Sequence, residues 1–541
     1  MWDLGDEMYK RVVAVFSAFA LVFGLLSMRV LQIQNSAWAA AAVSNSSVTA
    51  YYESTRGMIY DYKMRPITYM DHETLAVVRP TPEALEELAG VLSHEELESL
   101  YTRLSDGKPA AIVLDRPLKG SGEITVVDHL LRYSKSGLAC HVIGYTGGDS
   151  GEGESGLEKT CDEYLKQFSG ELRISYPVDA QGRLLAGAKA DITDTAAEVR
   201  GGIRLTLDRD IQQIAEQAMD ENGIDKGAVI IMEAGSGKIR ALASRPAYDA
   251  NRIADYLDDP DSPLINRALH AYAVGSVFKP VIAAAALSAG VDPQFTYECT
   301  GSIRVGDTVF HCHKEEGHGR IGMDTAVAES CNTYFIALGQ AAGAQAVLSM
   351  AENLGFGVEN EIADGMAGDA GTLPTAAELE NPAALANFSF GQGSLTATPL
   401  QIAAMYNALA SGGQYYEPYL IEAKIGENGE ELEPDQPAAP LNAVDRKDVL
   451  KIDSYLEKTV REGSGSAAAS PLFASSGKTA TAQTGQFADG VEINQSWFAG
   501  FFPSENPRYT VVILKEDGVS GGIDCAPVFK AITEGIHMLE G

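Results

Sequence analysis

Residues 271–287 read AYAVGSVFKPVIAAAAL, and this stretch decides how the rest of the chain is interpreted. Ser276 and Lys279 stand three residues apart at the start of an apolar, alanine-rich run, which predicts a helix. At about 3.6 residues per turn, the two side chains lie on one face of that helix. A serine hydroxyl needs an adjacent base, and a lysine amine supplies one when burial or nearby cations lower its pKa. The pair is therefore a candidate nucleophile and base.

The spacing of this pair is not specific by itself, because residues 105–108 and 475–478 share it. Two further polar motifs follow Ser276 in the chain. The first is Ser-Cys-Asn at 330–332, and the second is Lys-Thr-Ala-Thr at 478–481. Three motifs in a fixed order are far less expected by chance than any one of them, so we interpret them together.

The ordered motifs resemble the S-x-x-K, S-x-N and K-T-G signature of penicillin-binding proteins and serine β-lactamases. Further segments extend the resemblance to the class B penicillin-binding proteins, over roughly residues 50–535. They are R-G-M-I-Y-D at 56–61, H-V-I-G-Y at 141–145, S-G-L-E at 155–158, G-A-V at 227–229, A-L-A-S-R-P at 241–246, N-R-A at 266–268, G-Q-G at 391–393, T-P-L-Q at 398–401 and W-F-A-G-F at 497–501. The cysteine at 331 and the segments 299–301 and 311–313 resemble the division and sporulation branch.

The resemblance implies a D,D-transpeptidase that cross-links peptidoglycan stem peptides and binds β-lactams. Ser276 would attack the carbonyl of the penultimate D-Ala and release the terminal D-Ala, with Lys279 as base. Ser330 would relay protons to the leaving amine, and Asn332 would hydrogen-bond the donor peptide. A second stem peptide's amine would then attack the acyl-enzyme and complete the cross-link.

The third motif is expected to bind the end of the donor peptide. By the same resemblance, Lys478 supplies positive charge and Thr479 holds the terminal carboxylate. The backbone N–H groups of Ser276 and Thr481 would form an oxyanion hole, in which each donor typically contributes about 3–4 kcal/mol. Ala480 stands where the family has glycine, and a glycine lets the substrate lie close to the strand. We therefore expect Ala480→Gly to raise acylation by penicillin.

The resemblance implies an α+β fold in four parts. Residues 1–11 are a cytoplasmic tail, 12–28 a transmembrane anchor, 29–200 an elongated pedestal domain, and 201–541 a transpeptidase domain. The last domain would have an antiparallel sheet flanked by helices, as in serine β-lactamases. No glycosyltransferase domain fits before residue 201, so a bifunctional class A enzyme is excluded.

The anchor is predicted from composition as well. Residues 12–28 carry no charge, and their length is at the short end of a membrane span. Lys10 and Arg11 precede them and only Arg29 follows, which favours a cytoplasmic N-terminus and places the rest of the chain outside the cytoplasm. The alternative is a cleaved signal peptide with its cleavage site at Ala-Trp-Ala, 37–39.

Composition excludes one class of partner. The chain of 541 residues has a net charge of −33, and such a surface repels nucleic acid. Gly-Glu-Gly-Glu-Ser-Gly at 151–156 matches a dinucleotide-binding pattern, but its acidic residues would repel a pyrophosphate. We interpret Ser155 and Glu158 as a capping box for the next helix, and expect no cofactor.

A group of cysteines and histidines lies between the first two motifs, at 299, 311, 312, 313, 318 and 331. Their spacing matches no zinc pattern that we recognise, so we expect no metal site. Outside the cytoplasm, a redox-sensitive pair between Cys331 and either Cys312 or Cys299 is our hypothesis. The alternative is that the thiols are free and only pack in the core.

Two other functions compete with the transpeptidase. A β-lactamase or β-lactam sensor would use the same serine, but would not need the segments from Arg56 onward. A catalytically weak scaffold of a wall-synthesis complex is the other alternative, and only Ala480 favours it. The family's usual partner is a membrane glycan polymerase. The sequence leaves open a role in division, elongation or sporulation.

Overall fold

The computed structural model describes residues 3–34, 46–114, 116–148, 151–179, 181–185, 187–434, 437–488 and 490–541. The chain divides into two compact units that alternate along the sequence. The N-terminal unit comprises Met1–Thr55, His72–Leu130 and Ser169–Val199, and the C-terminal unit comprises Arg56–Asp71, Leu131–Phe168 and Arg200–Gly541. The sequence predicts a different kind of division, into a pedestal at 29–200 and a catalytic domain at 201–541. The compact units do not test that functional division, so it stays a prediction.

The chain begins with a long apolar helix, α1 (Asp3–Gln34). Its segment Glu7–Gln32 has a mean hydropathy of 2.1 and none of it is buried. The phenylalanine side chains at 16, 19 and 23 are each more than 70% exposed. At about 1.5 Å per residue, a helix of this length exceeds the roughly 30 Å of a bilayer core. The helix is therefore long and apolar enough to cross a membrane; residues 37–39 lie outside the described residues.

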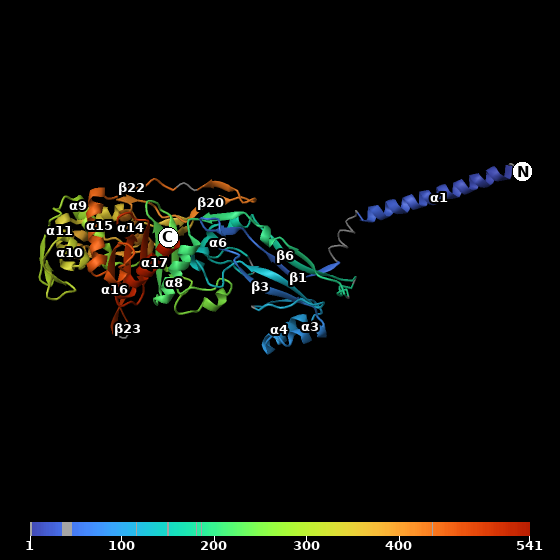
Figure 1. Ribbon diagram of the computed structural model, residues 1–541, viewed down its shortest axis with the longest axis horizontal. Coiled ribbons are helices and arrows are strands. Elements are labelled where there is room, and N and C mark those ends of the chain that lie inside the picture. The colour runs from blue at the N-terminus through green and yellow to red at the C-terminus, as the bar shows by residue number, and fades with distance from the viewer. Residues whose placement is uncertain are drawn as a thin grey trace. The chain divides into compact units, whose positions relative to one another are not determined.

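The N-terminal unit contains two three-stranded sheets (Figure 1). One has the order β1 (Ser47–Ser54), β6 (Glu171–Pro177), β7 (Asp191–Asp194). In the other, β3 (Asp71–Val78) lies between β4 (Ala110–Leu114) and β5 (Ile124–Leu131). Side chains on the two faces of β3 pack in two separate hydrophobic cores. Leu75 and Val77 pack with β6 on one face. Ala76 and Val78 pack on the other face with α3 (Pro82–Leu88) and α4 (His94–Leu104).

A proline at 82, followed by acidic residues in the first turn, predicts a helix start there, and α3 confirms it. The Thr81 side chain accepts a hydrogen bond from the Ala84 N–H, and proline occupies the first turn, where its missing N–H costs nothing. Ser93 and Glu96 form a capping box at the start of α4.

The C-terminal unit is built on a five-stranded antiparallel sheet. Its order is β10 (Ile239–Arg245), β9 (Gly227–Glu233), β25 (Tyr509–Lys515), β24 (Val491–Phe502), β23 (Ser476–Ala488). Two strand-like runs, 227–232 and 239–244, joined by the short turn 233–238, predict a hairpin, and the antiparallel pairing of β9 with β10 confirms it. Strand β23 is at the edge of the sheet, so one side of its backbone is not paired with another strand.

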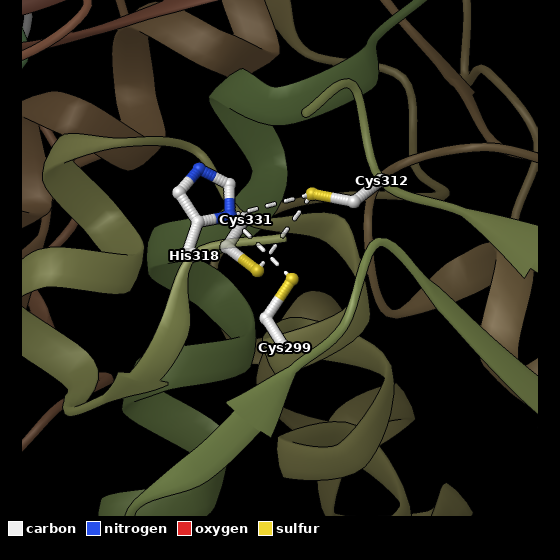
Figure 2. Close-up of side chains that lie close together, drawn as sticks. All are labelled: Cys299, Cys312, His318 and Cys331. Carbon is white, nitrogen blue, oxygen red and sulfur yellow. Dashed lines mark hydrogen bonds between the residues drawn. The ribbon is translucent and has the colours of Figure 1, made fainter. Parts of the chain in front are cut away.

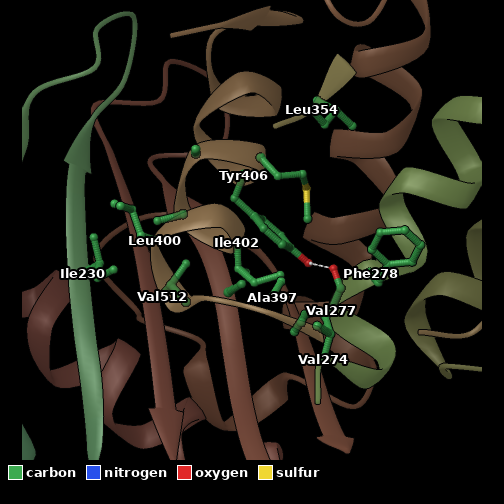
Figure 3. Packing of buried hydrophobic residues seen from close by; sticks show 14 of the residues in the cluster. Ile230, Val274, Val277, Phe278, Leu354, Ala397, Leu400, Ile402, Tyr406 and Val512 are labelled. Atoms are coloured by element: carbon green, nitrogen blue, oxygen red, sulfur yellow. Dashed lines mark hydrogen bonds between the residues drawn. The ribbon is translucent and has the colours of Figure 1, made fainter. Parts of the chain in front are cut away.

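Helices cover both faces of this sheet, as the resemblance implied. On one face, Val229 and Ile231 of β9 pack with α8 (Arg209–Glu221) and α17 (Ala526–Glu540). On the other face, Ala228 and Ile230 pack in the larger core with α9 (Lys279–Ser288) and α14 (Pro399–Ala410). Figure 3 shows this second core around Tyr406.

The remaining elements of the C-terminal unit surround these layers (Figure 1). A four-stranded sheet has the order β2 (Met58–Tyr60), β8 (Gly202–Leu205), β20 (Ile421–Ile425), β21 (Glu431–Pro434). The other helices that matter here are α10 (Met323–Ala328), α11 (Asn332–Ala342), α12 (Ala344–Asn353), α13 (Pro382–Phe388) and α15 (Arg446–Glu462).

The expected capping box at Ser155 and Glu158 is wrong. Ser155 does precede α6 (Gly156–Thr160), but its side chain makes no capping hydrogen bond. The Glu158 carboxylate is fully buried and forms ion pairs with Arg56 and Arg132. Two guanidinium groups bind a buried carboxylate more strongly than a backbone N–H does. Both arginines lie far from Glu158 in sequence, so local spacing did not reveal them.

Candidate active site

Ser276 lies in a tight turn at the start of α9. Residues Gly275–Phe278 form a 3₁₀ turn (η4), and α9 continues from Lys279. In a 3₁₀ helix, residues three apart eclipse each other, so Ser276 and Lys279 lie on the same side. Gly275 has φ of +64° and donates its N–H to the Gly391 carbonyl at 2.8 Å. A Cβ at Gly391 would lie 1.9 Å from the Gly275 carbonyl oxygen, which explains the glycine of the G-Q-G motif.

Two fully buried aromatic side chains hold the backbone on either side of Ser276. Trp497 of β24 donates its indole N–H to the Ala273 carbonyl at 2.9 Å. Tyr406 of α14 donates its hydroxyl to the Val277 carbonyl at 3.1 Å (Figure 3). Because buried hydrogen bonds are costly to break, these contacts fix the turn against the sheet.

The Lys279 ammonium joins the first motif to the second. Its Nζ donates to the Ser330 carbonyl at 2.7 Å, to Ser330 Oγ at 3.0 Å and to Asn332 Oδ1 at 2.7 Å. These three acceptors match the three N–H bonds of an ammonium group. The side chain is fully buried. Two motifs about 50 residues apart therefore converge on one amine.

Ser330 adopts an unusual backbone conformation that makes these contacts possible. It lies between α10 and α11 and has φ of +57°. At positive φ, only a small left-handed region of backbone conformation is allowed for residues with a side chain. Such a conformation costs on the order of 1–3 kcal/mol and persists only where the surroundings enforce it. Both the carbonyl and the hydroxyl of Ser330 bind the Lys279 Nζ.

Burial changes the protonation of both motif lysines. Loss of hydration lowers the pKa of Lys279 to about 7, against a smaller opposing effect from the thiols of Cys331 and Cys312. Burial also lowers the pKa of Lys478 well below its usual value; the nearby charge of Lys279 adds to this, and Glu329 opposes it. An amine that is neutral near pH 7 can accept a proton from a hydroxyl.

The third motif lies on the edge strand β23. Lys478 is fully buried, and its Nζ donates to the Thr479 carbonyl at 3.0 Å. The Thr479 hydroxyl lies 2.9 Å from the hydroxyl of Ser464, while Thr481 is exposed. Ser464 was missed by the sequence analysis. The segment Gly463-Ser464-Gly465 indicates only a loop, and no spacing relates it to Thr479.

Strand β23 lies directly beside the turn that carries Ser276. A Cβ placed on Gly275 would lie 3.1 Å from the Cβ of Ala482 and 3.4 Å from the Cβ of Ala480. Ala480 is only 3% exposed. Its methyl group therefore packs toward the nucleophile turn, inside the molecule, and is not presented to solvent.

The structure thus brings Ser276, Lys279, Ser330, Asn332 and the third motif to one place. Among the described residues, no side chain makes a hydrogen bond with Ser276 Oγ, since Lys279 bonds to the second motif instead. Catalytic hydrogen bonds are often long or unformed until the substrate binds, so this geometry is compatible with Lys279 as base.

One group of metal-binding side chains occurs in the part of the chain that the structure describes: Cys299, Cys312, His318 and Cys331. Cys331 stands between Ser330 and Asn332, so this group adjoins the site.

Comparisons with known proteins agree with this geometry. The family model of the penicillin-binding protein transpeptidase domain matches residues 227–534. Peptidoglycan D,D-transpeptidase PbpA of Mycolicibacterium smegmatis is 29% identical over 468 residues, covering 79% of this chain and 91% of that protein. Stage V sporulation protein D of Bacillus subtilis is 26% identical over 556 residues, covering 96% of this chain and 84% of that protein.

Solved structures give the same result. The D,D-transpeptidase domain of a peptidoglycan glycosyltransferase from Eggerthella lenta is 25% identical, with a TM-score of 0.65, and covers 90% of this chain and 99% of that one. Penicillin-binding protein A of M. tuberculosis, solved as a ceftriaxone acyl-enzyme, is 22% identical with a TM-score of 0.66, covers 89% of this chain and 98% of that one, and shares the fold. With its motifs assembled as the sequence resemblance implied, the chain belongs to the penicillin-binding proteins with a transpeptidase domain, in class B.

Proposed function

We propose that this chain is a peptidoglycan D,D-transpeptidase that cross-links stem peptides through an acyl-enzyme on Ser276. The observation that carries the proposal is the buried Lys279 amine, which is bonded to Ser330 and Asn332 and lies one turn from Ser276. Its pKa of about 7 makes it a base at neutral pH.

In the acylation step, Lys279 accepts the Ser276 proton as Oγ attacks the carbonyl carbon of the penultimate D-Ala. The carbonyl oxygen gains negative charge, and the backbone N–H groups of Ser276 and Thr481 stabilise it. The C–N bond to the terminal D-Ala then breaks. Ser330, whose hydroxyl is 3.0 Å from Lys279 Nζ, passes the proton on to the leaving amine.

Strand β23 would bind the donor peptide. As the edge strand of its sheet, it offers unpaired backbone N–H and C=O groups to an extended chain. Asn332 is half-buried and can hydrogen-bond an amide of the donor, Lys478 supplies positive charge, and Thr479 binds the terminal carboxylate. Ser464, bonded to the Thr479 hydroxyl, orients that hydroxyl.

The same serine would react with β-lactams. Two solved relatives, both of penicillin-binding protein A from M. tuberculosis, are acyl-enzymes with ceftriaxone and with penicillin G. In the second half of the cycle, the amine of another stem peptide attacks the acyl-enzyme. Lys279 takes a proton from that amine and passes it to Ser276 Oγ as the ester bond to the donor peptide breaks, which restores the serine hydroxyl and the neutral lysine.

The rest of the chain would hold the active site at the outer side of the membrane. We propose that α1 anchors the protein in the membrane with residues 1–11 in the cytoplasm, so that the catalytic domain, 201–541, lies outside it. Residues 29–200 would be the pedestal. A membrane glycan polymerase would be the partner, because cross-linking consumes newly made glycan strands.

The test uses the full chain in detergent, supplied with polymerised glycan whose stem peptides end in D-Ala-D-Ala. We expect release of D-Ala together with cross-linked products, and neither with Ser276→Ala. D-Ala release that survives in Ser276→Ala would contradict the proposal. Rapid penicillin hydrolysis without cross-links would instead support the β-lactamase alternative, and a folded chain inert to both substrates would support the scaffold.

A further inference from the structure

Four side chains that no catalytic role uses converge beneath the second motif. Cys299, Cys312 and Cys331 are buried, His318 is partly buried, and the four ligand atoms all lie within 4.8 Å of one another. Figure 2 shows the three sulfur atoms and the imidazole pointing toward a common centre. We call these four residues the Cys₃His cluster.

The spacing of the atoms is that of a tetrahedral metal site. With Zn–S near 2.3 Å and Zn–N near 2.0–2.1 Å, tetrahedral angles place sulfur atoms about 3.8 Å apart and sulfur and nitrogen about 3.5 Å apart. Cys312 Sγ and Cys331 Sγ are 3.8 Å apart. His318 Nδ1 lies 3.5 Å from Cys299 Sγ and 3.6 Å from Cys312 Sγ. These three separations agree with the expected values to about 0.1 Å.

Two short antiparallel strand pairs bring these residues together, and the second lies between the strands of the first in the sequence. β12 (Tyr297–Cys299) pairs with β15 (Gly319–Ile321), and β13 (Ser302–Val305) pairs with β14 (Thr308–His311). Gly317, with φ of +79°, lies so close to the other loop that a Cβ there would be 2.1 Å from the Cys299 carbonyl oxygen. A glycine is therefore required where the two cysteine loops meet.

The imidazole of His318 lacks the partners that usually hold a histidine. Among the described residues, its Nδ1 faces only sulfur atoms, and its partly enclosed ring leaves Nε2 without a hydrogen bond. Polar atoms in such surroundings normally have an oxygen or nitrogen partner. Neutral thiols donate only weak hydrogen bonds, so free thiols account less well than a metal ion for an imidazole nitrogen directed at two of them.

We propose that the Cys₃His cluster binds one Zn²⁺ ion in a closed, structural site. Three thiolates and one imidazole are a standard ligand set for structural zinc, and they leave no position open for substrate. On binding, the cysteine thiols lose their protons to solvent, and His318 coordinates through Nδ1 as a neutral ring. The ion would join both strand pairs to the N-terminus of α11.

The metal would position the catalytic residues through Cys331. Cys331 directly follows Ser330 and precedes Asn332, and both of these bind Lys279 Nζ. Fixing the Cys331 sulfur restrains the left-handed turn at Ser330, which needs support from its surroundings. This second claim rests on the proposed function, whereas the metal site does not.

The competing chemistry is the disulfide considered from the sequence. Cys312 Sγ and Cys331 Sγ are 3.8 Å apart, well beyond the roughly 2.05 Å of a disulfide bond. All six cysteines are free thiols in the structure. Oxidation would remove two of the four ligands, so the disulfide and the metal exclude each other.

The first experiment measures metal content and thiols on the full chain, purified in detergent without chelator. We expect about one zinc per chain and, after denaturation with chelator and no reductant, six titratable thiols. Less than about 0.1 zinc per chain, or four thiols, would overturn the proposal. Replacement by Co²⁺ should give the intense visible bands of a tetrahedral thiolate site; a weak octahedral spectrum would contradict it.

Variants locate the metal. Cys312→Ser and His318→Ala should each lose zinc, whereas Cys161→Ser, which changes a partly buried cysteine outside the cluster, should retain it. If the cluster variants do not fold, the zinc content of the wild-type chain still decides the question. Zinc retained in a folded Cys312→Ser variant with full occupancy would place the metal elsewhere.

The positioning claim is tested by removing zinc and measuring acylation with a fluorescent penicillin. We expect the rate of acylation to fall about fivefold while circular dichroism is unchanged, and to recover with Zn²⁺ but not with Mg²⁺. An unchanged rate after complete zinc removal would overturn this claim. A zinc-loaded chain that penicillin never labels would contradict the proposed function and leave the metal site standing.

Discussion

Two groups of side chains meet at residues 330–332, and they differ in how the sequence encodes them. The lysine site, formed by Ser276, Lys279, Ser330 and Asn332, consists of short motifs whose members are three residues apart or fewer. The Cys₃His cluster consists of single residues separated by 13, 6 and 13 positions. Both are assembled beside one turn, yet the spacing of residues in the sequence groups only the first.

The difference shows when the spacing of residues in the sequence is enough to predict which side chains lie together. A helical turn fixes the relation of residues three apart, so the spacing of Ser276 and Lys279 is enough to place their side chains together. The cluster depends on two strand pairs and on glycines that let loops approach closely, and the spacing of its residues reveals neither. Substitutions in each group separately show whether the two groups affect acylation independently.

The largest effect should come from Lys279→Met, which removes the base and keeps a buried chain of similar length. Acylation by a fluorescent penicillin should fall by about a thousandfold, within the usual contribution of a general base. Zinc content should not change. A fall below about tenfold would show that another group takes the serine proton.

The pH dependence of acylation should report the same amine. Since burial lowers the pKa of Lys279 to about 7, the neutral form, which is the base, is lost as pH falls through that value. Between pH 8 and pH 6 the acylation rate should therefore fall by about tenfold. A flat profile over this range contradicts the assignment, and Lys279→Met should abolish the dependence.

Coupling between the two groups is the next prediction. If the cluster acts only by positioning the contacts of Lys279, then Cys312→Ser should slow acylation about fivefold in the wild-type chain and have little effect in Lys279→Met. Cys161→Ser is the matched control and should have no effect in either background. Additive losses would mean that the cluster supports something other than the lysine site.

Ser464→Ala should have a smaller effect. The Ser464 hydroxyl lies 2.9 Å from that of Thr479 and orients it, so its loss should weaken acylation by about threefold. Ser466→Ala, an exposed serine in the same loop, is the control. Equal rates for both variants would remove Ser464 from the site.

The smallest effect is expected from Ala480→Gly. We predicted from sequence that it raises acylation, and the buried position of the methyl group, facing the Ser276 turn, leads us to expect a rise below about threefold. The rate of penicillin labelling and the melting temperature measure it. Slower acylation would show that the methyl group supports the turn.

The fold was predictable where a local signal sufficed. The hairpin at 227–244 follows from two strand-like runs around a short turn, and the helix start at Pro82 from the proline and the acidic residues of its first turn. The capping box at Ser155 failed, because the partners of Glu158 are Arg56 and Arg132, far away in the chain.

The residues of the site also differ in whether the sequence revealed them. Its motif residues could be named from order and spacing, but their supports could not. Three supports are tertiary contacts: Trp497 with the Ala273 carbonyl, Ser464 with Thr479, and the convergence of the Cys₃His cluster. A single sequence carries no information on which distant side chain fills such a role.

The central claim is that Ser276 is the nucleophile of this site. The most direct measurement is the intact mass of the full chain after reaction with penicillin, followed by mapping of the modified peptide. We predict one stable adduct per chain, located on Ser276 and absent in Ser276→Ala. An adduct on another residue, or equal labelling of Ser276→Ala, would contradict the account.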